Sequence, residues 1–233
     1  MDRPVPNLND SGPRRLAAAG ALLFVATFVV SVVLSGPPIV HERQQGIEHS
    51  LSERGVVPVF TSMFVLVLGL LALTVTMTFL ANALGRSSAS SALAAQTAWA
   101  GGLGYLFILA VAFSAGAAAA WARHGGSELE IVLVVNNVRN FAYFAAMPFM
   151  GVAALGFGAA AIADRVMTRW VGWGGVAVGV LCLLAVPAAA VGVSYAMPLW
   201  LLWWLGAGIT LLRQPAVDEP TAARAPAAAF GHD

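Results

Sequence analysis

Four polar side chains recur at helical spacing inside one of the most apolar stretches of the sequence. The segment 134-VVNNVRNFAYF-144 contains Asn136, Arg139, Asn140 and Tyr143. With 3.6 residues per turn these four share one face of a helix, whereas Asn137 lies to the side. A guanidinium flanked by amide groups suits an anionic group such as a carboxylate or a lipid phosphate. These residues therefore form the first candidate ligand-binding site.

The counter-charge of Arg139 decides what this face does, because an arginine within a membrane is costly unless it meets a partner, a cavity or a headgroup. No other predicted span has an internal Asp or Glu. The candidate counter-charges are in the first outer loop and at the start of the same helix: Glu42, Glu48, Glu53, Glu128 and Glu130.

The depth of Arg139 in the membrane follows from helix length. Counted from residue 162 at about 1.5 Å per residue, Arg139 is about 34 Å along its helix, close to the outer interface of a hydrocarbon core about 30 Å thick. Two interpretations stay open. The arginine lies at headgroup level while the asparagines bond between helices, or it lines a cleft that opens outward and binds a ligand.

The second candidate site is the loop 41-HERQQGIEHSLSER-54, where two histidines and several glutamates invite a metal ion. However, HERQQ lacks the second histidine of the HExxH zinc motif, and in a helix His41 and His49 would be about 12 Å apart along the axis. We therefore predict no metal site and keep these two histidines as the residues to test. No Ser/His/Asp arrangement or pair of carboxylates within a span indicates catalysis, so we predict a non-enzymatic protein without a cofactor.

The elements that position these residues are membrane helices. Of the 233 residues 59% are hydrophobic and 10% are charged, whereas about 25% are charged in an average globular protein; the mean hydropathy is +0.81. Apolar runs of about 18 residues or more are typical of transmembrane helices. They predict an all-α transmembrane helix bundle with six spans, at about 16–35, 56–83, 92–121, 129–162, 170–194 and 197–212. One domain over 16–212 then lies between disordered tails at 1–15 and 213–233.

The basic residues are all arginines, and their distribution predicts the orientation. The inner segments hold Arg3, Arg14, Arg15, Arg86, Arg165, Arg169, Arg213 and Arg224, and the outer loops hold Arg43, Arg54 and Arg123. Because cytoplasmic loops carry the excess of positive charge, both termini are predicted to lie in the cytoplasm. The absence of lysine excludes Schiff-base chemistry on this chain, and the single cysteine, Cys182, excludes an internal disulfide.

Tryptophans and glycines indicate what the helices contact. Trp170 and Trp173 at the inner start of the fifth span, and Trp200, Trp203 and Trp204 near the outer part of the sixth, are predicted interfacial anchors. Gly175 and Gly179 form a GxxxG pair, which lets membrane helices approach closely. The glycines are therefore predicted to be packing positions.

The turn between the fourth and fifth spans carries a family resemblance. The segment 147-MPFMGVAALGFGAAAIADRVMTRWVGWGGVAVGV-180 is similar to a group of bacterial six-helix membrane proteins known as a domain of unknown function. In that group a Gly-rich helix, a short basic inner turn and a second Gly-rich helix follow one another. Arg165, Arg169 and Gly172 match the turn, and Thr168 stands where the group has a proline. The opening 20-GALLFVATFVVSVVLSGPP-38 resembles the first helix of the group. The resemblance implies a fold for 16–212, but no catalytic residues and no substrate.

These observations predict a multi-pass protein of a bacterial inner membrane, embedded in lipid, with a structural, sensory or partner-binding role. The first alternative is a binder or transporter of a small anionic or lipid-like molecule, through an outward-facing cleft at Arg139. The second is an enzyme on the extracytoplasmic face that uses the loop from His41 to His49. No nucleic acid is predicted as a partner, and the residues leave the oligomeric state open.

Overall fold

The computed structural model describes residues 11–35, 55–165, 167–189 and 195–213, and every regular element within them is a helix. The helices are α1 (Ser11–Ser35), α3 (Val56–Ala83), α4 (Ala89–His124), α5 (Leu129–Asp164), α6 (Arg169–Ala189) and α7 (Ala196–Arg213). The predicted all-α class is confirmed. Five helices are long and apolar enough to cross a membrane, and α6 adds a shorter apolar helix over Arg169–Ala185.

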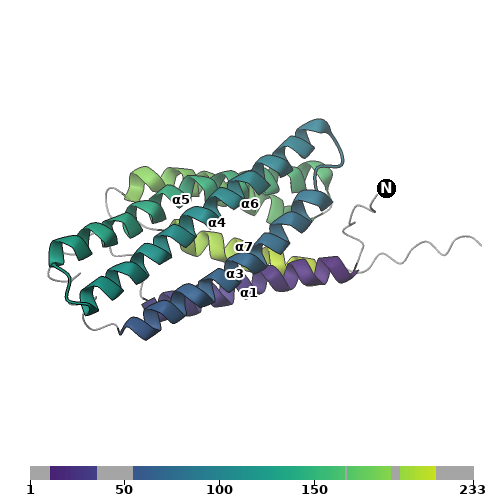
Figure 1. Cartoon of the computed structure of the whole chain (residues 1–233). Coiled ribbons are helices and arrows are strands. Elements are labelled where there is room, and N and C mark those ends of the chain that lie inside the picture. Colours follow the sequence, from purple (N-terminus) through teal and green to yellow (C-terminus); the bar gives the residue numbers. More distant parts are fainter. Residues whose placement is uncertain (1–10, 36–54, 166, 190–194, 214–233) are drawn as a thin grey trace, which may run out of the picture.

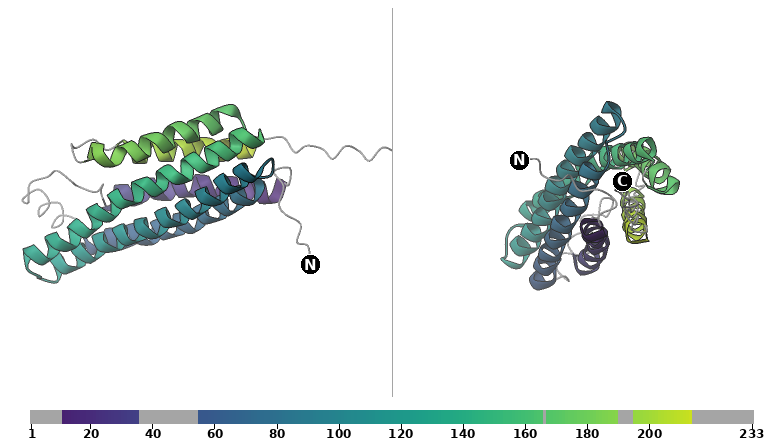
Figure 2. Two further views of the ribbon diagram at one scale, coloured as in Figure 1. Left: turned by 90° about the horizontal axis from the view of Figure 1, so that it is seen from above. Right: turned by 90° about the vertical axis from the view of Figure 1, so that its right-hand side faces the viewer.

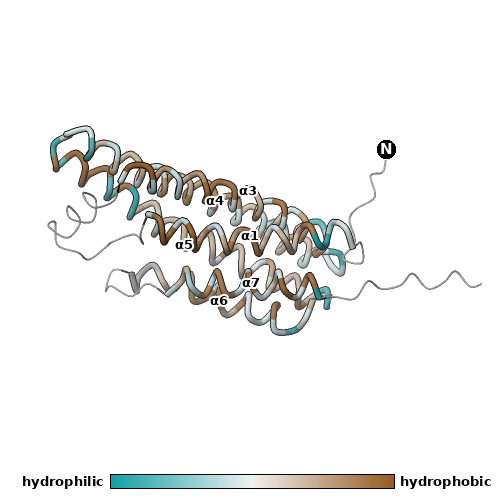
Figure 3. The backbone as a smooth tube through the Cα atoms, turned by 90° about the horizontal axis from the view of Figure 1, so that it is seen from below, coloured by the Kyte–Doolittle hydropathy of each residue, from teal (hydrophilic) through white to brown (hydrophobic). Residues whose placement is uncertain are grey.

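The helices are arranged as a closed ring. Each one packs against the next along the chain, and α7 packs against α1. Consecutive helices run in opposite directions, so the start of α1 and the end of α7 lie at the same end of the bundle (Figure 1, Figure 2). The hydrophilic parts of the described chain gather at the two ends, and the middle is mostly hydrophobic (Figure 3).

The first helix begins earlier than the apolar pattern predicts. It starts at Ser11 rather than at residue 16, and Arg14 and Arg15 are part of it. Pro13 fits this position, because the N–H that proline lacks has no intrahelical partner in the first turn of a helix. The Arg14 side chain is buried, so this basic pair belongs to the folded bundle.

Small side chains set the distances between the helices. A Cβ atom on Gly158 of α5 would lie 2.7 Å from the carbonyl oxygen of Gly172, and one on Gly179 would lie 2.8 Å from that of Gly151. A Cβ on Gly175 would lie 2.9 Å from the oxygen of Ala154. The backbones of α5 and α6 therefore touch, and the predicted packing role of the glycines is confirmed.

Hydroxyl groups join α1 to α3 inside the bundle. Ser31 Oγ donates to the carbonyl oxygen of Ser62 (2.9 Å), and Ser62 Oγ donates in return to that of Ser31 (2.8 Å). Thr76 Oγ1 donates to the carbonyl of Ala17 (2.7 Å). All three hydroxyl side chains are fully buried. Such bonds stabilise membrane helix pairs by about 0.6 kcal/mol each on average.

Aromatic rings fill the centre. Tyr105 of α4 lies between Phe24 of α1 (ring centroids 6.4 Å apart) and Trp200 of α7 (5.3 Å). Trp204 packs on Phe157 of α5 at 6.3 Å. Trp200, Trp203 and Trp204 are all buried, so the prediction that they anchor α7 at the membrane interface is wrong. They turn toward the ring interior, where they bury more apolar surface than a headgroup contact would.

Candidate functional site

The polar face predicted on α5 points into the protein. Asn136, Arg139, Asn140 and Tyr143 are all buried, whereas Asn137 is exposed. The helical period alone produces this division, because residues three and four apart lie on the same side. Their role in ligand binding stays a prediction.

Arg139 lies against α4 at a glycine. A Cβ atom on Gly116 would lie 3.0 Å from Cδ and 3.1 Å from Nε of Arg139, and only 6% of the arginine is exposed. Gly116 therefore leaves the space that the arginine side chain occupies. The side chain points into the contact between α4 and α5, not outward to lipid headgroups.

The described chain holds few carboxylates that could face this guanidinium. On its own helix, Glu130 is nine residues away, about 13 Å along the axis. Asp164 is at the other end of α5. The predicted counter-charges Glu42, Glu48 and Glu53, and the histidines His41 and His49, lie outside the described residues. Within the described parts of the chain, no group of three or more His, Cys, Asp or Glu side chains is placed to hold a metal ion.

A second polar cluster, which no sequence motif predicted, joins the end of α5 to the turn between α3 and α4. The Asp164 carboxylate accepts hydrogen bonds from the backbone N–H groups of Gly85 (2.5 Å), Arg86 (3.1 Å) and Ser87 (3.2 Å). It also accepts from the hydroxyls of Ser87 and Ser91, the latter at 2.6 Å. Successive backbone N–H groups form a cradle for an anion, and here a carboxylate of the same chain fills it.

The local sequence explains this cradle. Gly85 adopts φ +82°, and a Cβ there would lie 2.7 Å from Cα of Ala92, so only glycine fits the turn. Ser88 then caps α4, because its hydroxyl accepts from the N–H of Ser91 (3.1 Å). The run 85-GRSSAS-90 was the available signal, but its partner lies 73 or more residues away along the chain.

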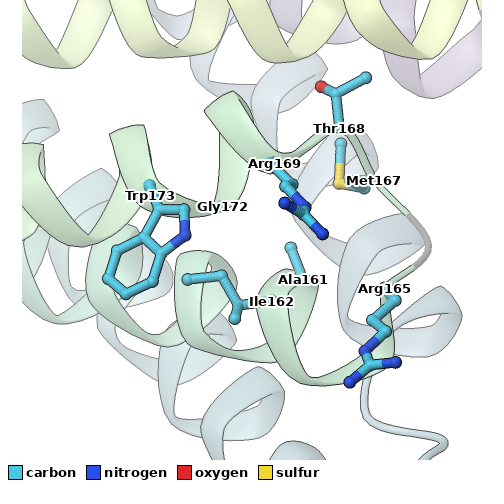
Figure 4. A pocket seen from close by; sticks show the side chains of 8 residues that line it. All are labelled: Ala161, Ile162, Arg165, Met167, Thr168, Arg169, Gly172 and Trp173. Atoms are coloured by element: carbon cyan, nitrogen blue, oxygen red, sulfur yellow. The ribbon is translucent and has the colours of Figure 1, made fainter.

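A hollow lies beside this cluster, where α5 ends and α6 begins. Its volume is about 440 Å³. Figure 4 shows Arg169 and Trp173 on α6 next to Ala161 and Ile162 of α5, with Arg165 at the end of α5. Arg165 ends the helix in the left-handed conformation, at φ 56°. This residue redirects the chain, so that α6 starts four residues later and a basic opening forms between the two helices.

A further hollow of about 430 Å³ lies between the end of α3 and the start of α4. Asn82, Arg86 and Gln96 supply its polar groups. The Arg86 side chain folds back on its own helix, because Nε and Nη2 both donate to the carbonyl oxygen of Asn82 (3.3 and 3.1 Å). This guanidinium therefore serves to close the helix end.

The chain was compared with protein-family models, with curated proteins and with solved structures. None of the three comparisons finds a match, so the resemblance to the six-helix group stays a prediction, and the function has to be argued from the geometry.

Proposed function

We propose that this chain is a six-span protein of a bacterial inner membrane, with both termini in the cytoplasm, and that its role is binding, not catalysis. It holds a stiff helical hairpin beyond the outer membrane surface, and the exposed side of this hairpin assembles with a second copy of the chain.

The distribution of arginines supports the orientation. At the end of the bundle where α1 starts and α7 stops, the described residues include Arg14, Arg15, Arg86, Arg165, Arg169 and Arg213. At the opposite end, the turn between α4 and α5 is preceded by Arg123. The excess of positive charge at the first end supports its placement on the cytoplasmic side.

The observation that carries the proposal is the length of the hairpin. Helices α4 and α5 have 36 residues each, against 21 in α6 and 18 in α7. At 1.5 Å per residue each long helix spans about 54 Å, more than the about 40–45 Å of a bilayer with its headgroups. An average tilt of about 20° shortens this height by only about 6%. The turn between α4 and α5 extends past the ends of α1, α6 and α7 (Figure 1).

The outward side of α5 carries a helix-binding pattern. Ile131, Val134, Val138 and Phe141 are all exposed, and Val134 is 64% exposed. Their spacing of three, four and three residues is that of the seam of a coiled coil. Ile131 and Val134 are about 46 and 42 Å from Ile162, beyond the acyl chains that could cover them. A second copy in the same membrane has its α5 parallel to the first. A two-fold axis along the membrane normal then brings the same residues of the two seams into contact.

Cysteine chemistry tests both parts of the proposal. In a Cys182→Ser background, Glu128→Cys should react with a membrane-impermeant maleimide in intact cells, whereas Ala89→Cys should react only after lysis. Val134→Cys should give a disulfide-linked dimer under mild oxidation in native membranes. Ala118→Cys is the matched control, since it is exposed at a similar height on α4. Reversed labelling overturns the orientation, and equal cross-linking of the two variants overturns the assembly.

A second candidate function is binding of a small anionic or lipid-like molecule at Arg139. The burial of Asn136, Arg139, Asn140 and Tyr143 on one face favours it, because a buried arginine with amide neighbours suits a carboxylate or a phosphate. A thermal-shift panel of carboxylates and phosphates tests it. Stabilisation that persists in Arg139→Gln assigns the binding to another site.

A further inference from the structure

The hollow between α5 and α6 is lined by charged, aromatic and apolar side chains. Arg165 and Arg169 line it together with the indole of Trp173 and the apolar groups of Ala161 and Ile162. Among the hydrogen bonds and ion pairs of the described residues, none involves either guanidinium. Two guanidinium groups at one opening attract a phosphate more strongly than one, because each can donate two parallel hydrogen bonds.

The neighbouring carboxylate, that of Asp164, forms its hydrogen bonds with the turn between α3 and α4 and not with these arginines. Asp164 directly precedes Arg165, yet both of its oxygen atoms accept hydrogen bonds from the turn between α3 and α4, at Gly85, Ser87 and Ser91 among others. Its charge is therefore held on the other side of the helix end. Among the residues that the structure describes, no acidic side chain lines the hollow, so this lining carries two positive charges and no negative one.

The surface that continues from the hollow is apolar. Trp173, Ala177, Val180 and Leu184 are exposed along one side of α6, and their spacing of four, three and four residues keeps them in line. Trp173 is 63% exposed and forms both the wall of the hollow and the first member of this line. Indole rings favour the headgroup level of a bilayer. A ligand with a charged head and a long apolar tail fits both parts at once.

The geometry points to a binding site for one anionic phospholipid, whose phosphate lies between Arg165 and Arg169 and whose acyl chain lies along Trp173, Val180 and Leu184. Basic hollows between membrane helices are known to hold anionic headgroups. The close contact of α5 and α6 at Gly158 and Gly172 keeps the opening at the helix ends. The site does not depend on which side of the membrane this end faces, and it is independent of the hairpin.

Thermal unfolding of the purified full chain in detergent tests the site. Addition of dioleoyl-phosphatidylglycerol should raise Tm by about 5 °C at saturation, more than the same amount of dioleoyl-phosphatidylcholine. The double variant Arg165→Gln/Arg169→Gln should lose most of this difference. Arg213→Gln is the matched control, because it removes an arginine at the same end that does not line the hollow, and it should keep the difference.

Three results would overturn the site: equal stabilisation by the two lipids, a double variant that responds like the unchanged chain, or a full effect of inorganic phosphate alone, which would mean a small-anion site. If the double variant does not fold, the single variant Arg169→Gln replaces it. This variant should lose at least half of the difference between the two lipids, and a smaller loss also contradicts the assignment.

Discussion

The Asp164 cluster offers the sharpest test of how the bundle is held together. Replacing Asp164 by alanine removes the acceptor of five hydrogen bonds that join the end of α5 to the turn between α3 and α4. We expect Asp164→Ala to destabilise the protein, because the N–H groups of the cradle then lose a charged acceptor that they share.

The magnitude follows from the kind of bond and from its exposure. A hydrogen bond to a charged group contributes about 1.5–3 kcal/mol when it is well buried. Here most of the donors are exposed, so in the variant water molecules accept hydrogen bonds from these donors in place of the carboxylate. We therefore expect a total loss of about 2–4 kcal/mol, the upper part of the range for single substitutions. For a chain of this length that corresponds to a fall in Tm of about 5–10 °C.

Equilibrium unfolding with increasing SDS in mixed micelles, followed by circular dichroism, measures the loss. Asp164→Asn keeps one acceptor oxygen, so its loss of stability should be about half of that in Asp164→Ala. Glu130→Ala is the control, since it removes an exposed carboxylate at the other end of α5 and should change stability by less than about 0.5 kcal/mol. A loss below about 0.5 kcal/mol in Asp164→Ala would refute the cluster as a lock between the helices.

Three further predictions concern helix contacts. Gly158→Leu should destabilise the contact of α5 and α6 by about 2 kcal/mol or more, measured by the same SDS titration, because its Cβ would lie 2.7 Å from a backbone oxygen. Gly116→Leu should displace the Arg139 side chain, and a double-mutant cycle with Arg139→Ala should show coupling of about 1 kcal/mol. Ser31→Ala and Ser62→Ala should each cost about 0.5–1 kcal/mol, and their combination about the sum, since each hydroxyl donates to a backbone carbonyl that the other substitution leaves in place.

The chain provides a control for the glycine variants. A Cβ atom on Gly12 meets no atom within 4 Å, so Gly12→Ala should leave the SDS midpoint unchanged or raise it slightly. Equal losses in Gly12→Ala and Gly158→Leu would show that the titration does not report close packing. Additive losses in the cycle of Gly116 and Arg139 would mean that the two residues do not touch.

Much of the fold follows from the sequence because a membrane makes helix prediction simple. A backbone inside lipid has to satisfy its own hydrogen bonds, so long apolar runs become helices. The bounds of α3, Val56–Ala83, coincide with the predicted 56–83. The start of α1 does not, because Arg14 is buried in the bundle and hydropathy places an arginine outside.

The direction in which side chains point was harder to predict. The period of α5 correctly groups Asn136, Arg139, Asn140 and Tyr143 on one side, and that side is buried. Periodicity does not say which neighbour lies there, and Gly116 of α4 was not identified. Tryptophan occurs both at membrane interfaces and in protein cores, so the residue type alone does not predict where Trp200 and Trp204 lie. Only the ring closure of α7 on α1 decides between them.

The polar groups around the turn between α5 and α6 divide into two sets: those that bond to other described residues and those that do not. The Asp164 carboxylate, the Ser87 hydroxyl and the Ser91 hydroxyl are engaged with one another, and their removal should change stability. Arg165 and Arg169 line a hollow, and their removal should change the response to lipid far more than stability without lipid. If the variants of both sets change only the stability without lipid, the turn is a structural element only. If they separate, the same few residues contain a lock and a binding site that act independently.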